Sequence, residues 1–285
     1  MSAVEWQQRP TLTSPILVVA FEGWFDAGEA ATGAVRWVSQ NYNAELAARI
    51  DPEPYYNFQQ ARPRVRFDSK GERVIEWPSN DCSAVHLEGQ SHDLAMIAGV
   101  EPHLRWRAFA ADLIELARGF SAEMVVTLGS LIDRVPHTRQ PPVKGSSTND
   151  ELAHRLGLDR PTYQGPTGIV GVLHDALDKE SLPVISLRVA IPHYVSGTPN
   201  PKATKALLAY FEQVTGVTTH HAKLDHAAVE WERRVDEAVA SDDDVQSYVR
   251  RVEEEVDRQA EQEIPSGDAL AAEFEKFLRE QRGED

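Results

Sequence analysis

The chain has little cysteine, no long apolar run and a deficit of positive charge, and each shortage excludes a class of protein. Cys82 is the only cysteine among 285 residues, so no internal disulfide can form and a disulfide-stapled secreted domain is excluded. The first apolar run, residues 16–21, is too short for a signal sequence or a membrane span. We therefore expect a cytoplasmic protein with no membrane partner.

Positive charge is scarce, most of all near the carboxyl end. The formal net charge is −16, and residues 219–285 contain 20 acidic and 9 basic side chains. Nucleic acids bind proteins mainly through Lys and Arg on the phosphate backbone. Basic grooves interleaved with aromatic side chains are also absent from the sequence. We therefore expect no nucleic-acid partner.

Cofactor and nucleophile motifs are missing as well. The turn after the first apolar run contains Glu22 and Asp26 and matches neither the dinucleotide fingerprint nor the phosphate-binding loop of nucleotide hydrolases. The two acids would also repel a phosphate at this strand-to-helix turn. Ser130 follows Gly129 without the G-x-S-x-G context of a hydrolase nucleophile. The sequence therefore predicts no cofactor and assigns no catalytic residue.

Metal ligands do not gather at a favourable spacing. The densest set of candidates is His220, His221, Asp225 and His226. Only His221 and Asp225 share a helical face at i and i+4, and no third ligand is spaced to join them. We expect no metal site.

What the sequence does contain is an alternation of apolar strands and amphipathic helices. Gly and Pro at 165–168 precede an apolar helix with Val170, Leu173 and Leu177 on one face, and then a buried strand at 184–191. Similar buried strands are predicted at 16–21, 83–89 and 124–129, and helices at 28–40, 103–118, 149–156 and 201–215. This pattern predicts an α/β fold, a three-layer α/β/α sandwich around one sheet of parallel type.

Other segments lie outside this alternation. Residues 1–13 are predicted to be a loose arm, residues 62–76 a hairpin with a polar outer face, and residues 130–148 a long irregular loop. The sandwich should occupy residues 14–218. Residues 219–285 are predicted to be an acidic helical extension with narrow apolar stripes. These stripes fit packing on the same chain or contact with another copy, and both alternatives stay open.

Loops at the carboxyl ends of the strands carry the candidate ligand-binding residues, since ligands of open α/β sheets bind at that edge. Imidazole, guanidinium and carboxylate groups there could bind and protonate a small anionic or carbonyl-bearing ligand. The same groups could instead form ion pairs and hydrogen bonds that hold the loops to the core. The candidates are Glu22, Asp26, Gln90, Arg134, His137, Arg139, His193 and Tyr194.

Three motifs in order resemble a known family. They are Asp133–Arg139 with Val143–Gly145, Gly165–Ile169, and Pro192–Tyr194 with Pro199–Pro201. Together they resemble the signature of the proteasome assembly chaperone-2 family, in its bacterial, actinobacterial-type branch, over residues 14–218. The acidic extension is similar to the one that this branch carries.

The resemblance implies a phosphorylase/hydrolase-like sandwich and a tendency to self-associate. It implies homo-oligomers, with a trimer as the starting assumption, and another protein complex as a further partner. Relatives dock on proteasomes through a C-terminal hydrophobic-Tyr-any tripeptide, whereas residues 281–285 read Gln-Arg-Gly-Glu-Asp. Two hypotheses follow: a scaffold or assembly factor, and a small-ligand binder or enzyme with a cleft at the strand ends. Whether the chain is an enzyme stays open.

Overall fold

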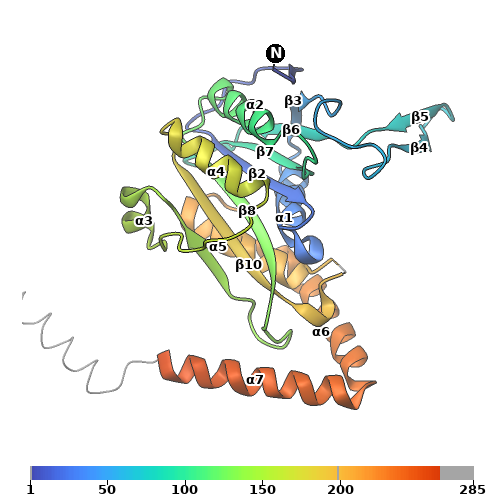
Figure 1. Ribbon diagram of the computed structural model, residues 1–285, viewed down its shortest axis with the longest axis vertical. Helices are drawn as coiled ribbons and strands as arrows, with labels where there is room; N and C mark the ends of the chain where they lie inside the picture. The colour runs from blue at the N-terminus through green and yellow to red at the C-terminus, as the bar shows by residue number, and fades with distance from the viewer. Residues whose placement is uncertain (1, 198, 264–285) are drawn as a thin grey trace, which may run out of the picture.

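The computed structural model describes residues 2–197 and 199–263, and its centre is a mixed sheet (Figure 1). In the described residues eight strands follow one another in the order β1-β3-β6-β7-β2-β8-β10-β9, and β4 and β5 form a separate hairpin. The strands are β1 (Val4–Trp6), β2 (Ile16–Glu22), β3 (Glu45–Ile50), β4 (Arg64–Phe67), β5 (Arg73–Glu76), β6 (Asn80–Val85), β7 (Leu94–Val100), β8 (Met124–Asp133), β9 (Val143–Ser146) and β10 (Val184–Pro192).

Helices cover both faces of this sheet. Strand β2 is buried on both sides: Ile16, Val18 and Ala20 pack in the cluster under α1 and α5, whereas Leu17, Val19 and Phe21 pack in the cluster under α2 and α4. The helices are η1 (Ala27–Glu29), α1 (Ala30–Asn41), α2 (Trp106–Gly119), α3 (Asp150–Leu156), α4 (Ile169–Lys179), η2 (His193–Val195), α5 (Pro201–Thr215), η3 (His221–Leu224), α6 (Asp225–Ala240) and α7 (Asp243–Glu263). The predicted three-layer α/β/α sandwich is confirmed.

Only the centre of the sheet is parallel. Strands β7, β2, β8 and β10 pair in parallel, so their carboxyl ends lie along one edge, which we call the carboxyl rim. Strands β1, β3, β6 and β9 pair antiparallel to their neighbours. The prediction of one parallel-type sheet is therefore wrong for the flanks. Residues 86–93 between β6 and β7 are too few for a crossover helix, which parallel pairing of consecutive strands would require.

Helix ends follow the local sequence. The Asn149 side chain accepts the backbone N–H of Leu152 at 3.0 Å, and the Asn200 side chain accepts that of Ala203 at 2.9 Å, as expected for N-caps. Gly216 ends α5 with φ +74°, a left-handed conformation that glycine adopts without strain. These predicted boundaries are confirmed, and α5 is thereby placed with its amino end at the carboxyl rim.

Three further predictions are corrected. Residues 4–6 of the predicted loose arm pair with β3, because they close an otherwise open sheet edge. The strand expected at 83–89 runs instead over Asn80–Val85. The predicted irregular loop at 130–148 begins inside β8, which continues to Asp133, and contains β9 near its end.

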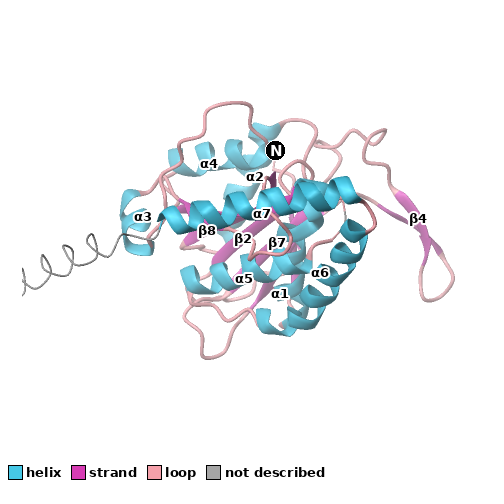
Figure 2. Cartoon of the chain, turned by 90° about the horizontal axis from the view of Figure 1, so that it is seen from below, coloured by secondary structure: helices cyan, strands magenta, loops and turns pink. Residues whose placement is uncertain are grey.

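The helical extension covers the carboxyl rim. Leu224, Ala228, Trp231 and Val235 form a buried stripe on η3 and α6, which pack on α5. Asp242 accepts the backbone N–H groups of Asp244 and Val245 and starts α7. Figures 1 and 2 show α7 lying across the ends of the central strands. Within the described residues the stripes therefore pack on the same chain. The helix predicted to carry Leu270, Phe274 and Phe277 lies outside the described residues.

The hairpin of β4 and β5 stands away from the sandwich, as both views show (Figures 1 and 2). Its predicted existence is confirmed, with Arg64 paired to Glu76 and Phe67 to Arg73. Over residues 2–197 and 199–263, the structure contains no helix with the length and apolar character needed to cross a membrane.

Candidate functional site at the carboxyl rim

The buried His137 and the half-buried Tyr194 form a pair at the carboxyl rim. The Tyr194 hydroxyl oxygen accepts the backbone N–H of His137 at 2.9 Å and lies 2.8 Å from its Nδ1. His137 Nε2 lies 2.9 Å from the Asp236 carboxylate on α6. The Tyr194 hydroxyl is therefore shared by the backbone N–H and the ring Nδ1 of His137, and Nε2 lies within hydrogen-bond distance of Asp236. Burial raises the pKa of Tyr194 to about 12, so the phenol stays protonated.

Arginines of the rim are paired with carboxylates of α7. Arg139 binds Asp257 with two hydrogen bonds, of 2.9 and 2.7 Å, in the bidentate geometry that guanidinium and carboxylate favour. Arg134 lies 2.8 Å from Glu255. The hydrogen bond to Asp257 raises the pKa of Arg139, and the same bond lowers the pKa of Asp257. Both arginines thus hold α7 on the rim.

Two further residues, Lys202 and Tyr248, connect the rim to α6 and α7. Lys202 Nζ, at the start of α5, donates to the His137 carbonyl at 2.6 Å and to Glu232 of α6 at 2.8 Å. Tyr248 of α7 meets the rings of His193 and Tyr194 edge-on, with centroids 5.2 and 6.4 Å apart. Thus five of the predicted site residues come together under α6 and α7. They are Arg134, His137, Arg139, His193 and Tyr194.

Glu22 and Asp26 lie on the same rim, but their side chains bind groups of α1. Asp26 accepts the backbone N–H groups of Ala31 and Thr32 at 2.9 and 3.1 Å, which satisfies first-turn donors of the helix. Burial raises the pKa of Asp26, against the opposing effect of these hydrogen bonds. Glu22 forms an ion pair with Arg36 of α1. Both carboxylates are engaged with the helix that their own turn begins.

Gln90 does not join the other candidates. It precedes β7, which runs parallel to β2, so it lies at the edge opposite the carboxyl rim. There its side chain accepts the backbone N–H of Thr218 at 2.8 Å and donates to the Tyr42 hydroxyl at 3.1 Å. The expected convergence of all the loops is therefore wrong for Gln90. The error arises because β7 was not predicted. The strand before Gln90, β6, was therefore expected to run parallel to the central strands, whereas it runs antiparallel to β7.

The remaining candidates for special chemistry have structural partners. His221 Nδ1 lies 3.1 Å from Glu212, and Asp225 pairs with Lys205 at 2.6 Å. No group of three or more His, Cys, Asp or Glu side chains in the described part of the chain is placed to hold a metal ion. Cys82 is fully buried, and burial raises the pKa of its thiol to about 12, which leaves it unreactive at neutral pH.

The residues that bind the side chains of the carboxyl rim were not predicted from the sequence. Lys202, Asp236, Tyr248, Glu253 and Asp257 carry no motif, and most lie about a hundred residues from the groups that they bind. One signal was present: a strongly acidic extension follows a loop rich in Arg and His. Opposite charge on two segments indicates that they can pair, although it does not specify the register.

Known proteins share the sequence pattern and the fold of this chain. The family model described as PAC2 family matches residues 20–239. A PAC2 family protein from Streptomyces avermitilis is 42% identical, covering 82% of this chain and 99% of that chain, with a TM-score of 0.77. The Mycobacterium tuberculosis proteasome-assembly chaperone homologue Rv2125 is 39% identical, with the same coverage and a TM-score of 0.74.

A more distant relative shares the fold alone. PbaB from Pyrococcus furiosus, an archaeal proteasome activator, is 16% identical, covering 83% of this chain and 98% of that chain, with a TM-score of 0.68. Among curated proteins, none matches the chain.

Proposed function

Because the chain belongs to the PAC2 family, we propose that it is a proteasome-assembly-type factor that works by binding proteins, as a self-associated scaffold. The resemblance predicted from the three sequence motifs is confirmed by this membership. Support for the assembly role comes from Rv2125, which is named a proteasome-assembly chaperone homologue. The observation that carries the scaffold role is the exposed apolar face of the hairpin β4–β5.

This face is made by side chains from both strands. Val65 lies opposite Ile75 in the antiparallel register, so the two side chains share a face. Phe67 lies two residues after Val65 on β4 and points the same way, since side chains alternate. Trp77 follows the end of β5, two residues after Ile75. Their exposed fractions are 51% for Val65, 48% for Ile75, 69% for Phe67 and 45% for Trp77. A contiguous exposed apolar face of this kind is typical of a protein-binding surface.

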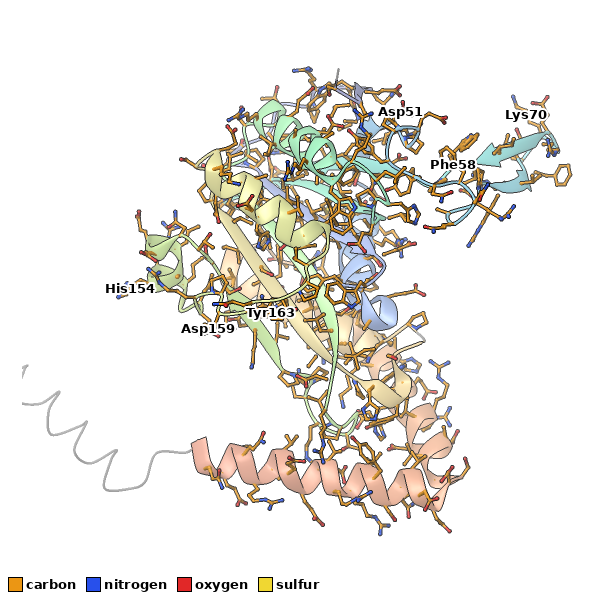
Figure 3. The ribbon with its side chains drawn as sticks, viewed as in Figure 1. Asp51, Phe58, Lys70, His154, Asp159 and Tyr163 are labelled. Atoms are coloured by element: carbon orange, nitrogen blue, oxygen red, sulfur yellow. The ribbon has the colours of Figure 1, made fainter. Side chains whose placement is uncertain are left out.

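The hairpin also lacks support of its own. Two-stranded ribbons are marginally stable in water unless a further surface covers one face. Figure 3 shows Lys70 at the tip and Phe58 near the base, with the hairpin extending away from the sandwich. Phe58 meets Trp77 edge-on with ring centroids 4.8 Å apart, which covers the base but not the strands. A protein partner would supply the missing cover.

Charge favours a second copy as that partner. Residues 62–76 contain five basic and three acidic side chains, whereas the whole chain has a net charge of −16. The hairpin is therefore a basic projection on an acidic protein, and the acidic surface of another copy complements it. A scaffold of several copies would then present its remaining surfaces to the subunits being assembled.

Self-association is tested by light scattering after gel filtration. The wild type is expected to exceed its monomer mass of 31.8 kDa at micromolar concentration, and Phe67→Ser with Val65→Ser should return it to the monomer. The matched control is Val229→Ser, because Val229 is 64% exposed on α6 and away from the hairpin. A monomeric wild type, or a control as disruptive as the hairpin variant, would refute the scaffold.

The assembly role needs its own experiment. Co-expression with proteasome α and β subunits of the source organism, followed by affinity capture of this chain, should recover those subunits in a defined ratio. Capture of the chain alone would contradict the assembly role while leaving self-association intact.

The alternative of a ligand cleft at the carboxyl rim is less well supported by the contacts. Arg134, His137, Arg139 and Tyr194 each bond with another residue of the chain. A ligand would have to compete with the α7 carboxylates Glu255 and Asp257 for the two arginines.

A further inference from the structure

One face of the sheet beside α4 carries an unusual set of polar side chains. Along this face β10 presents Val184, Ser186 and Arg188, of which Val184 belongs to the apolar cluster beneath α2 and α4. The half-buried Arg188 donates to Ser146 Oγ of β9 at 3.2 Å. Its cross-strand partner is Lys144, which therefore lies on the same face. The edge of the sheet is thus polar and cationic where a core would be apolar.

The chain segment that covers this face is not packed onto it. Residues 159–168 start at β9, where Asp159 bonds with the backbone of Gly145 and Ser147. They end at Glu101, which accepts the backbone N–H of Ile169 at 3.0 Å. Because β2, β8 and β10 lie between β7 and β9 in the sheet, this segment crosses them, as Figure 3 shows near Tyr163. Every residue from 159 to 167 is exposed, so none of them fills the face with a buried side chain.

Positive charge on the face exceeds negative charge. Within the part of the chain that the structure describes, neither Arg188 nor Lys144 forms an ion pair, and the two cations face each other across strands. Like charges directly opposite each other destabilise a sheet. Burial lowers the pKa of Arg188, and Asp159 is the one carboxylate that opposes this effect. Around Arg188, two cations and one carboxylate therefore leave an excess of one positive charge, whereas Asp178 acts on the neighbouring His174.

Neutral hydrogen-bonding groups line the adjoining wall. His174 Nε2 of α4 lies 2.8 Å from Thr127 Oγ1 of β8. Burial lowers the pKa of His174 to about 4, with Arg188 contributing in the same direction, so the imidazole is uncharged at neutral pH. Leu131 lies four residues after Thr127 on the same side of β8 and is partly exposed, and Tyr163 of the crossing segment is 72% exposed. The wall thus offers apolar surface, with the buried Thr127 bonded to His174 behind it.

We propose that this face, between α4 and the crossing segment 159–168, binds a small organic monocarboxylate. Arg188 and Lys144 hold the carboxylate, and Leu131 and Tyr163 contact the apolar body. A single negative charge balances the excess of one positive charge, whereas a phosphate dianion would overcompensate it. The proposal is independent of self-association, because the hairpin lies on a different part of the molecule.

Calorimetric titration of the full chain tests the chemistry. Phenylacetate is the probe, phenylacetamide its uncharged analogue, and inorganic phosphate the dianion. Phenylacetate is expected to bind saturably at one site with a Kd of about 1 mM or tighter, and the amide should give no binding. Lys144→Gln and Arg188→Gln should each weaken phenylacetate binding at least roughly tenfold, whereas the control Lys223→Gln, at an exposed position on η3, leaves it unchanged.

Several outcomes would overturn the proposal. They are no saturable phenylacetate binding, equal binding of the amide, tighter binding of phosphate, and full affinity in both variants. Lys144 is exposed, so Lys144→Gln keeps the fold, and circular dichroism checks Arg188→Gln. A second measurement needs no ligand: Lys144→Gln removes the opposed charge and should raise the melting temperature of the free chain by roughly 1–3 °C. A lower melting temperature would contradict the charge excess.

Discussion

Tyr194 satisfies two nitrogens of a histidine that has almost no contact with water. His137 is 2% exposed, and both its backbone N–H and its Nδ1 depend on the Tyr194 hydroxyl. Tyr194→Phe keeps the ring and removes the oxygen, so the free energy of unfolding should fall by about 1–3 kcal/mol, the cost of leaving buried polar groups unsatisfied. Urea denaturation measures it. Tyr163→Phe, at an exposed site, should change stability by less than about 0.5 kcal/mol, and an equal loss in both variants would contradict the assignment.

His86 and Asp93 form a pair whose contribution to stability depends on pH. The hydrogen bond to Asp93, 2.9 Å long, raises the pKa of His86 above 6.5. Burial acts to raise the pKa of Asp93, but hydrogen bonds from His86, Leu87 and Thr13 outweigh it and hold that pKa below 3.8. The His86 contribution is complete below pH 6.5 and is lost as pH rises through its folded-state pKa. The Asp93 contribution is present above pH 3.8 and is lost as pH falls through its folded-state pKa.

The stabilisation from this pair should therefore be largest between about pH 4 and pH 6.5. His86→Asn is expected to lower the unfolding midpoint at pH 5 and to leave it nearly unchanged at pH 8.5. Thermal denaturation of both proteins across this range provides the comparison. A midpoint difference that grows from pH 5 to pH 8.5 would show that the sign is wrong.

At the scale of elements, α7 is held on the carboxyl rim by two kinds of contact. Val249 and Val252 are 4% and 1% exposed, whereas the Arg139 and Asp257 side chains are 41% and 49% exposed. Exposed ion pairs contribute little and are screened by salt, and buried methyl groups contribute more. Val252→Ala should therefore destabilise α7 by about 1–2 kcal/mol, and Arg139→Gln by less than about 1 kcal/mol.

Hydrogen exchange over residues 243–263 separates these contributions. The effect of Arg139→Gln should shrink further in 0.5 M salt (roughly four-angstrom screening length), whereas that of Val252→Ala should persist. A larger effect from Arg139→Gln than from Val252→Ala at low salt, lost in 0.5 M salt, would mean that charge, and not burial, holds the helix. Asp244→Asn, at the amino end of α7, serves as a control that keeps both the valines and the arginine.

Elements were predictable where a short pattern determined them. The run Ile-Leu-Val-Val-Ala-Phe at 16–21 is buried on both faces and reads as a central strand, and Asn200 with Pro201 marks the start of α5. Strands β3 (Glu-Leu-Ala-Ala-Arg-Ile) and β7 (Leu-Ala-Met-Ile-Ala-Gly-Val) were missed because their Ala, Leu and Met residues favour helices. Pairing with neighbouring strands overrides that preference.

The residue types at the candidate site were predictable from the sequence, but the partners that they bind were not. The rule that ligands meet strand carboxyl ends placed His137, Arg139 and Tyr194 on one rim, and the structure puts them under the same two helices. Which carboxylate each group binds depends on how α6 and α7 lie on α5. Packing of that kind involves residues about a hundred positions apart, and a charge pattern alone does not determine it.

For the whole molecule, charge should decide how copies of this acidic chain approach one another. Two chains that each carry −16 repel at long range, so a stable contact between them needs a local region of opposite sign. The hairpin supplies one through Arg66 and Arg73, on β4 and β5. Arg66→Glu with Arg73→Glu should raise the self-association Kd at least about tenfold at 50 mM salt and by a smaller factor at 500 mM, since screening removes the repulsion that it adds.

Sedimentation measurements at the two salt concentrations give both constants, and Lys179→Glu with Lys223→Glu is the matched reversal away from the hairpin. If the matched reversal weakens association as much, net charge alone controls it and the hairpin has no special part. If neither reversal matters at 50 mM salt, apolar contact through Val65 and Phe67 holds the copies together without help from charge. In that case self-association depends on the exposed apolar side chains of β4 and β5, and not on the arginines that the same two strands carry.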